Sequence, residues 1–164
     1  MFAYRAAGKR KRVVIDSKEG SMRVHIPLLA TGLLILSSAS LPAASVTGNW
    51  FTHKAKSIVK ITRCGAGVCG RIVWLRKALN SEGHPVRDER NRNERYRGRK
   101  VLGLRTFSGL KRAGPRLWSG LLYNPDDGRT YQGSITLLDA SSIRVEGCRL
   151  GGGACGGRRW TRAQ

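Results

Sequence analysis

The amino-acid sequence predicts an all-β fold, a single antiparallel up-and-down barrel of eight strands. Short stretches of alternating apolar and polar residues recur from residue 48 onward with turn residues between them, which is the pattern of strands rather than of helices. Eight such stretches are present, the number that closes a small barrel. Gly48 and Trp50 lie on the first stretch, and Trp160 and Arg162 lie on the last. We therefore expect Trp50 to plug one end of the barrel, with Arg162 over its ring.

The predicted strands are separated by recognisable turns. In the second strand, Val59 and Ile61 alternate with polar neighbours, which indicates one buried face. Residues 124–128 form a hairpin turn in which proline fixes φ, aspartate bonds the local backbone and glycine takes a positive φ. The eight strands are expected at residues 49–53, 57–63, 69–75, 101–107, 116–123, 129–138, 142–149 and 156–162.

One connection is far longer than the others. Residues 76–100 contain nine Lys/Arg, four Asp/Glu and His84, with almost no apolar side chains. Ordered domains seldom keep so long a loop without a use. Two interpretations fit the composition. The loop is either a solvated flap over one edge or mouth of the barrel, or a lid that presents arginine forks to an anionic ligand.

The residues before the barrel have the composition of a secretory signal peptide. Residues 22–45 have a basic residue, Arg23, near their start, continue with an apolar run at 26–36 and end in small residues that include Ala43 and Ser45. The apolar run is shorter than the roughly 20 residues that a membrane span needs. We therefore expect a barrel domain at 46–164, periplasmic or secreted in a bacterium, and an uncleaved membrane anchor is the alternative. We interpret residues 1–21 as a basic leader upstream of a start at Met22, with a disordered basic tail as the alternative.

Four cysteines occur in two close pairs. Cys64 and Cys69 enclose four residues, and Cys148 and Cys155 enclose six, with glycines in both segments. In an oxidising compartment an even number of cysteines indicates disulfides, and four cysteines allow three pairings. Glycine-rich tips suit hairpins, so we favour the two local pairs. A four-cysteine zinc site is the alternative, although the usual Cys-x-x-Cys spacing is absent.

The charge of the chain is strongly positive. The formal net charge is +21, and residues 46–164 alone hold 24 Lys/Arg and eight Asp/Glu, about +16. Such an excess gathers anions over a long range without identifying them. We expect a small anionic molecule or an acidic component of the cell envelope as the partner, because the secretion signal argues against nucleic acid. The alternative is that the arginines only add solubility.

A set of short motifs occurs together along this region: Gly48-Asn49-Trp50, Cys64, Cys69-Gly70-Arg71-Ile72-Val73-Trp74-Leu75, Asp88, Asn91, Arg99, Leu102-Gly103-Leu104, Trp118-Ser119-Gly120, Tyr123-Asn124-Pro125-Asp126-Asp127-Gly128, Thr130-Tyr131 and Trp160-Thr161-Arg162. As a set they resemble the DUF2147 family of small secreted bacterial proteins, over nearly all of residues 46–164. The resemblance implies a lipocalin-like barrel and export, and it implies no established activity and no catalytic residue. The chain departs from the family pattern in its long leader and at Lys100 and Val101.

The sequence lacks the motifs of the common catalytic and cofactor sites. It has no Gly-x-Ser-x-Gly elbow, no His-Glu-x-x-His and no Gly-Lys-Ser/Thr phosphate loop, so we expect no cofactor and no metal, and a non-catalytic role is favoured over an enzymatic one, which stays open. His84 with a loop carboxylate such as Asp88 is the one candidate acid–base pair, and surface positions for both are the alternative.

The large aromatic and basic residues supply the candidate ligand contacts. We expect structural roles for Gly48, Trp50, Trp160 and Arg162 at the barrel end and in the core. The candidates for a ligand site are Trp74, Trp118 and Tyr123 on a cavity wall, and Asp88, Arg97 and Arg99 at its mouth.

These observations together favour a non-catalytic periplasmic or secreted barrel that binds a small or amphipathic, anionic ligand. The first alternative is a module of the cell envelope that docks its basic loop on a phosphorylated glycolipid or an acidic partner. The second alternative is a hydrolase that uses His84 and a loop carboxylate.

Overall fold

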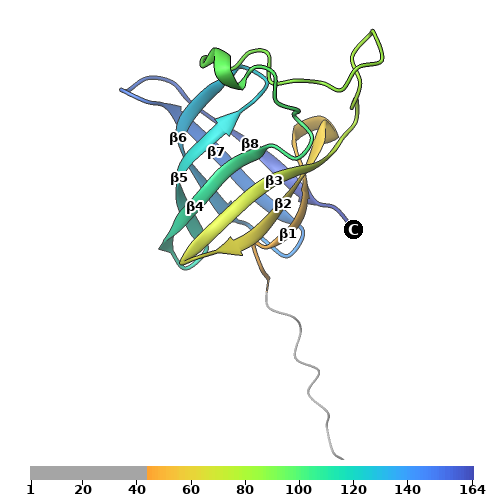
Figure 1. The fold of residues 1–164 in the computed structure, drawn as a ribbon. Coiled ribbons are helices and arrows are strands. Elements are labelled where there is room, and N and C mark those ends of the chain that lie inside the picture. The colour runs from red at the N-terminus through yellow and green to blue at the C-terminus, as the bar shows by residue number, and fades with distance from the viewer. Residues whose placement is uncertain (1–43) are drawn as a thin grey trace, which may run out of the picture. The chain divides into compact units, whose positions relative to one another are not determined.

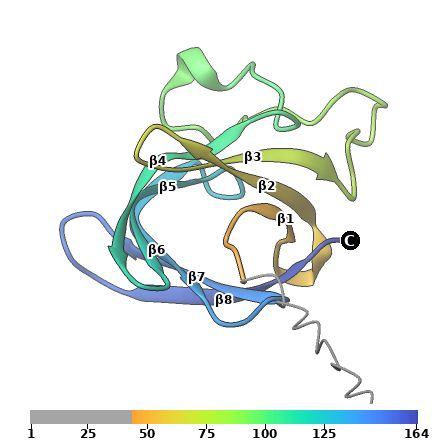
Figure 2. The ribbon, with the colours of Figure 1, turned by 90° about the horizontal axis from the view of Figure 1, so that it is seen from below.

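Alternating apolar residues and tight turns give eight strands that close on themselves, as Figure 1 and Figure 2 show for the computed structural model of the chain. Residues 44–164 are described, so the predicted basic leader and nearly all of the predicted signal peptide lie outside the described residues. Each strand pairs antiparallel with the next, and β8 returns to β1, which confirms the predicted up-and-down barrel. The strands are β1 Gly48–Phe51, β2 Ser57–Cys64, β3 Gly67–Leu75, β4 Arg105–Gly114, β5 Leu117–Asn124, β6 Arg129–Leu137, β7 Ser142–Arg149 and β8 Cys155–Arg162.

The fourth strand begins later than the sequence predicts. The chain turns just before it, because Gly103 has a φ of +88° and its N–H donates to the Ile72 carbonyl at 2.8 Å. Val101 and Leu104, which we expected in the strand, are instead buried in this turn, where the Leu104 N–H donates to the Val101 carbonyl at 3.0 Å. The apolar residues Val101 and Leu104 therefore anchor the end of the long connection and are not part of the strand.

Side chains occupy the interior of the barrel. Trp50, Leu110, Ile135 and Ile143 have no exposed surface, and the other core residues surround them. Inward-facing glycines make room for large neighbours: a β-carbon at Gly70 would collide with the Phe107 ring, one at Gly133 with Leu122, and one at Gly120 would lie 2.8 Å from Leu110. The described bore is therefore a packed core, as the interior of a small barrel commonly is.

One end of the barrel, which we call the closed end, carries the β2–β3, β4–β5 and β6–β7 turns and the end of β8. There the Arg162 guanidinium carbon lies 4.1 Å from the centroid of the Trp50 ring. The indole N–H of Trp50 donates to the Val46 carbonyl at 2.8 Å. A β-carbon at Gly48 would collide with Arg162, so the glycine on the first strand leaves the space that the guanidinium fills.

Both predicted disulfides are present, Cys64–Cys69 and Cys148–Cys155, each within a hairpin. All four cysteines are therefore used, and the zinc alternative is wrong. Within residues 44–164, no three His, Cys, Asp or Glu side chains are grouped so as to hold a metal ion.

The long loop, residues 76–104, leaves β3 at the opposite end of the barrel, which we call the loop end. It contains a short 3-10 helix, η2 Glu94–Tyr96, and two isolated β-bridges, Leu79 with Pro85 and Arg87 with Lys100. A second 3-10 turn, η1 His53–Ala55, joins β1 to β2. None of the helices in the described part of the chain combines the length and the apolar character that crossing a bilayer requires.

Candidate functional site

A buried carboxylate ties the long loop to the barrel. The Asp88 side chain is wholly shielded from solvent, a position that aspartate takes only when it is paired. The Nε and Nη2 atoms of Arg99 both lie 2.8 Å from Asp88 Oδ2. The hydroxyl of Tyr123, on β5, donates to Asp88 Oδ1 at 2.6 Å. The carboxylate therefore has a charge partner from the loop and a hydrogen-bond donor from the barrel.

Asn91 completes this arrangement, which we call the polar cluster: Asp88, Asn91, Arg99 and Tyr123. The Asn91 amide nitrogen donates to Asp88 Oδ2 at 2.9 Å and to the Tyr123 oxygen at 2.8 Å. Among the described residues, no buried side-chain nitrogen or oxygen lacks a hydrogen-bond partner. The buried polar atoms of the cluster are thus all hydrogen-bonded, and such a network holds its members rigidly.

The Tyr123 phenol is held in its protonated form. Burial, followed by the hydrogen bond to the Asp88 carboxylate and its charge, raises the pKa of Tyr123 to about 12, against a smaller opposing effect of Arg99. A phenol with such a pKa remains a donor throughout the physiological range. It is therefore a positioning group for Asp88 rather than a base or a nucleophile.

Arg99 is fixed on three sides. Its guanidinium carbon lies 5.0 Å from the centroid of the Tyr96 ring and 5.2 Å from that of Tyr123, in addition to its contacts with Asp88. The side chain nevertheless remains 38% exposed. Its Nη1 atom has no hydrogen-bond partner among residues 44–164, so Arg99 is held firmly with one donor group still available.

Backbone contacts explain why the loop folds over the barrel at this point. The Asp88 N–H donates to the Arg99 carbonyl at 2.9 Å, which brings together two residues that are eleven positions apart. At the β5–β6 turn, Gly128 has a φ of +68°, and a β-carbon there would collide with the carbonyl of Arg90. The glycine of the predicted hairpin turn therefore also permits the close approach of the loop.

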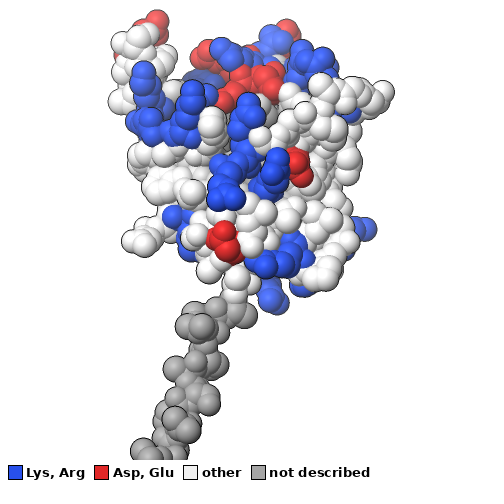
Figure 3. Space-filling view, turned by 180° about the vertical axis from the view of Figure 1, so that it is seen from behind, with Lys and Arg blue, Asp and Glu red and all other residues white. Residues whose placement is uncertain are grey.

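An open groove of about 730 Å³, which we call the mouth groove, lies between the long loop and the barrel rim. The polar cluster contributes Asn91, Arg99 and Tyr123 to its lining, and none of the described residues that line it is acidic. Figure 3 shows the face behind that of Figure 1, where basic side chains are spread widely and acidic ones gather at the loop end. The arginines and tyrosines of the groove are Arg92, Arg99, Arg105, Arg129, Arg149, Tyr96, Tyr123 and Tyr131.

Three of these arginines are free of protein partners. Within the described residues, the side chains of Arg92, Arg129 and Arg149 make no hydrogen bond and no ion pair. The hydrogen bond from the Tyr131 hydroxyl to Asp127 raises the pKa of the Tyr131 phenol, and the charges of Arg129 and Arg149 oppose that rise. Arg149 pairs with Tyr131 across β7 and β6, and Arg129 precedes Tyr131 by two residues on β6, so both arginines lie on the same face of the sheet as this ring.

The predicted ligand residues divide into two groups. Asp88, Arg99 and Tyr123 meet in the polar cluster, as the contacts above show. Arg97 lies beside them: its Nε donates to the Asn91 carbonyl at 2.9 Å, and its Nη1 pairs with Glu94 at 2.8 Å. Arg97 therefore braces the loop at the edge of the cluster.

Trp74 and Trp118 lie apart from this site. A register shift between Ile58 and Val59 turns Trp74 to the outer face, where its ring packs edge-on against Phe51 with 6.2 Å between centroids. Trp118 is half-buried near the closed end, with the Arg112 guanidinium 5.5 Å from its ring centroid. The structure therefore does not bring these two tryptophans together with Tyr123.

His84 does not pair with Asp88. Its Nδ1 atom lies 3.4 Å from Glu82 at the exposed loop tip, where both side chains are more than 70% exposed. The oxygens of Asp88 are occupied by Arg99, Asn91 and Tyr123, so the His84–Asp88 pairing that we considered is not formed.

Sequence reasoning missed most of the groove itself. The sequence pattern places Arg129 and Arg149 at the ends of predicted strands and gives no role to Tyr96 in the polar loop. The start of β6 and the end of β7 lie side by side at the loop end, because consecutive antiparallel strands run in opposite directions. Basic residues at the strand ends of that one rim were the signal that could have identified the groove.

Comparisons with known proteins agree with this fold. The family model described as "Uncharacterized protein conserved in bacteria (DUF2147)" matches residues 48–162. Protein HP1028 from Helicobacter pylori, which belongs to the lipocalin family, is similar in structure, with a TM-score of 0.61 and 20% sequence identity over 74% of this chain and 84% of that chain. At this identity the likeness shows the fold alone, a lipocalin-like barrel. No curated protein matches the chain.

Proposed function

The chain belongs to the DUF2147 family of bacterial proteins, and on the geometry of its own barrel we propose that it is a non-catalytic binding protein for a small amphipathic anion. The observation behind this proposal is the mouth groove, in which Arg92, Arg129 and Arg149 have no protein partner in the described part of the chain. Arginine forks bind carboxylate, sulfate and phosphate groups through paired hydrogen bonds. The charged group of the ligand therefore belongs between Arg129 and Arg149.

The apolar part of the ligand has surface available beside these arginines. Tyr96 and Leu150 line the same groove and are 46% and 56% exposed. A ring and a branched aliphatic side chain next to guanidinium groups suit a molecule with one charged and one apolar half. The packed interior of the barrel supports a site at the rim rather than in the bore.

The polar cluster supports binding by fixing the groove before the ligand arrives. Asp88 and the two tyrosine rings hold Arg99 in one position, so little side-chain entropy remains to be lost there on binding. Tyr123 stays protonated and therefore serves the cluster as a hydrogen-bond donor and not as a base. The cluster is therefore consistent with binding without chemistry.

We also propose that the protein works outside the cytoplasm, in the periplasm or after secretion. Two disulfides in a bacterial protein support this location, because such bonds persist in oxidising compartments. Release of the native protein with the periplasmic or extracellular fraction would agree with the proposal. Recovery in the cytoplasm with free thiols would oppose it.

The binding proposal is tested with 8-anilinonaphthalene-1-sulfonate, a small amphipathic anion whose fluorescence reports binding. Titration of the folded protein should reveal one saturable site. Replacing two of the groove arginines together, Arg129→Gln with Arg149→Gln, should weaken that site by about tenfold or more, because each hydrogen bond to a charged group contributes roughly 1.5–3 kcal/mol.

The matched control replaces two exposed arginines of β8, Arg158→Gln with Arg159→Gln. This control removes the same net charge away from the groove, so its affinity should fall by no more than about threefold through the weaker long-range field. Equal loss in both double variants, or no saturable binding to the wild-type protein, would disprove the proposal.

An anion presented on a membrane surface would use the same arginines. Salt-sensitive binding to vesicles that contain a phosphorylated glycolipid, combined with no binding of the free sulfonate, would favour the envelope-module hypothesis. Binding of the free sulfonate without any vesicle binding would favour a soluble ligand.

A further inference from the structure

The outer face of the barrel carries a second groove, of about 420 Å³, which we call the side groove. It runs across β2, β3 and β4, and the Cys64–Cys69 disulfide lies in its wall. The basic residues Lys60, Arg71 and Arg105 line the same groove. The disulfide is therefore open to an approaching molecule and surrounded by positive charge.

The strand beside this disulfide is bulged. Val68 pairs with Leu110 and Gly70 with Phe107, so on β4 both Ser108 and Gly109 stand opposite the single residue Cys69. Gly109 has a φ of +65°, the left-handed conformation that glycine adopts at such bulges. The bulge takes the Gly109 N–H out of the β3–β4 ladder and directs it to sulfur.

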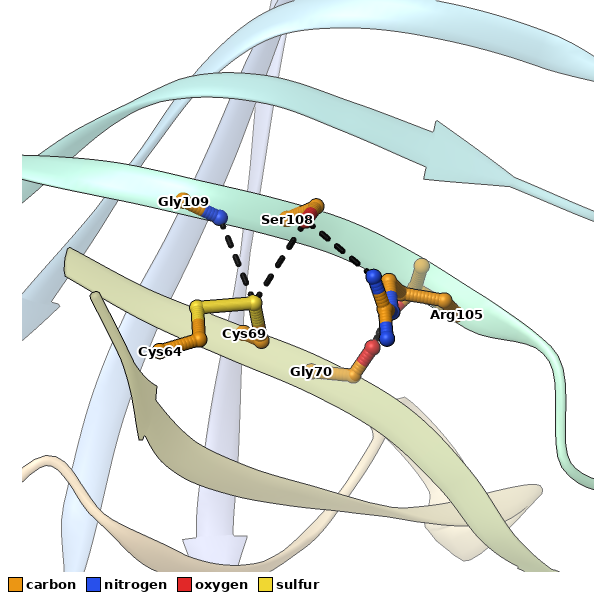
Figure 4. Close-up of a disulfide and its surroundings, with 7 residues drawn as sticks. Cys64, Cys69, Gly70, Arg105, Ser108 and Gly109 are labelled. Atoms are coloured by element: carbon orange, nitrogen blue, oxygen red, sulfur yellow. Dashed lines mark hydrogen bonds between the residues drawn. A yellow bond between two sulfur atoms is a disulfide. The ribbon is translucent and has the colours of Figure 1, made fainter.

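Two hydrogen-bond donors consequently meet at Cys69, as Figure 4 shows. The Gly109 nitrogen lies 3.4 Å from Cys69 Sγ, and the Ser108 hydroxyl oxygen lies 3.5 Å from it. A disulfide sulfur has no hydrogen, so the serine must be the donor. Arg105 Nη1 donates to the same serine oxygen at 3.4 Å, which leaves the serine hydrogen free for the sulfur.

The second disulfide has no comparable environment. Cys148 and Cys155 face each other directly across β7 and β8, and no donor among the described residues reaches either sulfur. Cys155 is exposed, whereas Cys64 and Cys69 are half-buried. Solvent exposure alone would therefore make Cys148–Cys155 the first disulfide to be attacked.

We propose that Cys64–Cys69 is an exchangeable, redox-active disulfide in which Cys69 is the sulfur that leaves as a thiolate. Donors and positive charges stabilise a thiolate far more than a neutral disulfide sulfur, so they favour the reduced form and speed departure of that thiol. The bulge, Ser108 and Arg105 supply this stabilisation at Cys69 and at neither sulfur of the other disulfide.

The exchange needs a dithiol reductant, and its steps balance with that reactant alone. A thiolate of the dithiol attacks Cys64 Sγ, the Cys64–Cys69 bond breaks, and Cys69 leaves as the thiolate while a mixed disulfide forms on Cys64. The second thiol of the reductant loses its proton to solvent and attacks the reductant's first sulfur in the mixed disulfide. The bond between that sulfur and Cys64 Sγ breaks, and Cys64 is released as a thiolate. Two electrons pass to the protein, and the reductant becomes a disulfide.

The two disulfides of one molecule provide an internal comparison. The folded protein is equilibrated with graded dithiothreitol at neutral pH, quenched with acid, alkylated and mapped by mass spectrometry. Cys64 and Cys69 should be half-alkylated at about tenfold less reductant than Cys148 and Cys155, because hydrogen bonds to a charged group shift an equilibrium by about that factor.

A pair of variants isolates the donor. Ser108→Ala removes the hydroxyl that donates to Cys69 and should raise the dithiothreitol needed for half-reduction severalfold. Thr62→Val is the matched control, because Thr62 lines the same groove and pairs with Cys69 across the strands, yet makes no side-chain hydrogen bond among the described residues. The control should leave the half-reduction point unchanged.

Single-cysteine variants identify the leaving sulfur. In Cys64→Ser, the thiolate absorbance of Cys69 should titrate below the ordinary thiol pKa of about 8.5, and in Cys69→Ser that of Cys64 should not. Opening of Cys148–Cys155 first, simultaneous opening of both bonds, or equal effects of Ser108→Ala and Thr62→Val would each overturn the proposal.

Discussion

An arginine against an aromatic ring closes each end of the barrel, but the two arginines have different partners. At the closed end, Arg162 lies over Trp50 and donates to three backbone carbonyls: to Ser45 and Ala140 at 2.6 Å and to Thr47 at 3.1 Å. All of its acceptors are neutral. All three of its guanidinium nitrogens are therefore engaged by backbone carbonyls, although none of these acceptors neutralises its charge.

At the loop end, Arg99 lies between Tyr96 and Tyr123 and faces the buried Asp88 carboxylate. Here the charge is neutralised, but only two of the three guanidinium nitrogens are used. Free arginines surround this pair in the mouth groove. The comparison shows how the same kind of contact engages every guanidinium nitrogen at one end and leaves one nitrogen of Arg99 without a protein partner at the other.

Among the changes that test this comparison, removal of the buried Asp88 carboxylate should have the largest effect on stability. Asp88→Ala leaves Arg99, Asn91 and Tyr123 without their common acceptor, and breaking a buried pair costs about 3–5 kcal/mol. Because Arg99 is partly exposed, we expect about 3 kcal/mol from urea unfolding, together with weaker binding of the sulfonate probe.

Glu94→Ala is the control for this change on the same loop. Glu94 pairs with Arg97 at the surface, so its removal should cost less than about 1 kcal/mol. A loss of stability for Asp88→Ala as small as that of Glu94→Ala would show that the polar cluster does not hold the loop.

Removing the plug at the closed end should have a smaller effect. Arg162→Ala loses the contact with Trp50 and the hydrogen bonds to three carbonyls, which we expect to cost about 2 kcal/mol in urea unfolding. Binding of the sulfonate probe should be unchanged, since the mouth groove lies at the other end. Impaired binding in folded Arg162→Ala would mean that the two ends are coupled.

The pKa of Tyr123 predicts a pH dependence that is specific to the loop end. The folded-state pKa of about 12 exceeds the unfolded value of about 10, so the stabilisation is complete below pH 10 and is lost as the pH rises toward 12. The difference in unfolding free energy between the wild-type protein and Tyr123→Phe should therefore shrink over this range. A difference that is constant from pH 9 to pH 12 would contradict the assignment.

The smallest effect is expected at the closed end, in the β6–β7 turn. Hydrogen bonds from Ser142 and Ser141 hold the pKa of Asp139 well below its usual value, so their stabilisation is present above about pH 4 and is lost in stronger acid. Because Asp139 is exposed, Asp139→Ala should lower the melting temperature only slightly at pH 7, and the difference should disappear at low pH. A difference that grows on acidification would argue against these bonds.

The parts of the fold that follow from local spacing were predictable from the sequence. Alternation predicts the strands except for the fourth, which begins later than expected. Glycine-rich intervals of four and six residues predict the disulfide pairs, and the positions of Trp50 and Arg162 at the two ends of the domain predict their contact. Each of these depends on one strand, one hairpin or the simple closure of the barrel.

The parts that depend on bulges and on loop packing were not predictable. A register shift beside Ile58 sends Trp74 outward, and simple alternation would not show it. The polar cluster joins Asp88 and Arg99 to Tyr123 across 35 positions of sequence, through a loop with no periodic pattern. Three of the six expected ligand residues nevertheless meet there. A buried carboxylate needs a cationic partner and a hydrogen-bond donor, and these three residues supply that combination.

The empty positions inside the sheet have a practical consequence for engineering. Gly70 has no side chain, and Phe107 alone fills the space that two residues would normally share. Phe107→Ala would therefore leave no large side chain at either position of the Gly70–Phe107 pair. The apolar void would not easily be closed by neighbours on rigid strands. Such voids stay dry and admit xenon or benzene. The scaffold is thus one substitution away from enclosing a hydrophobic chamber beneath a rim lined with arginines.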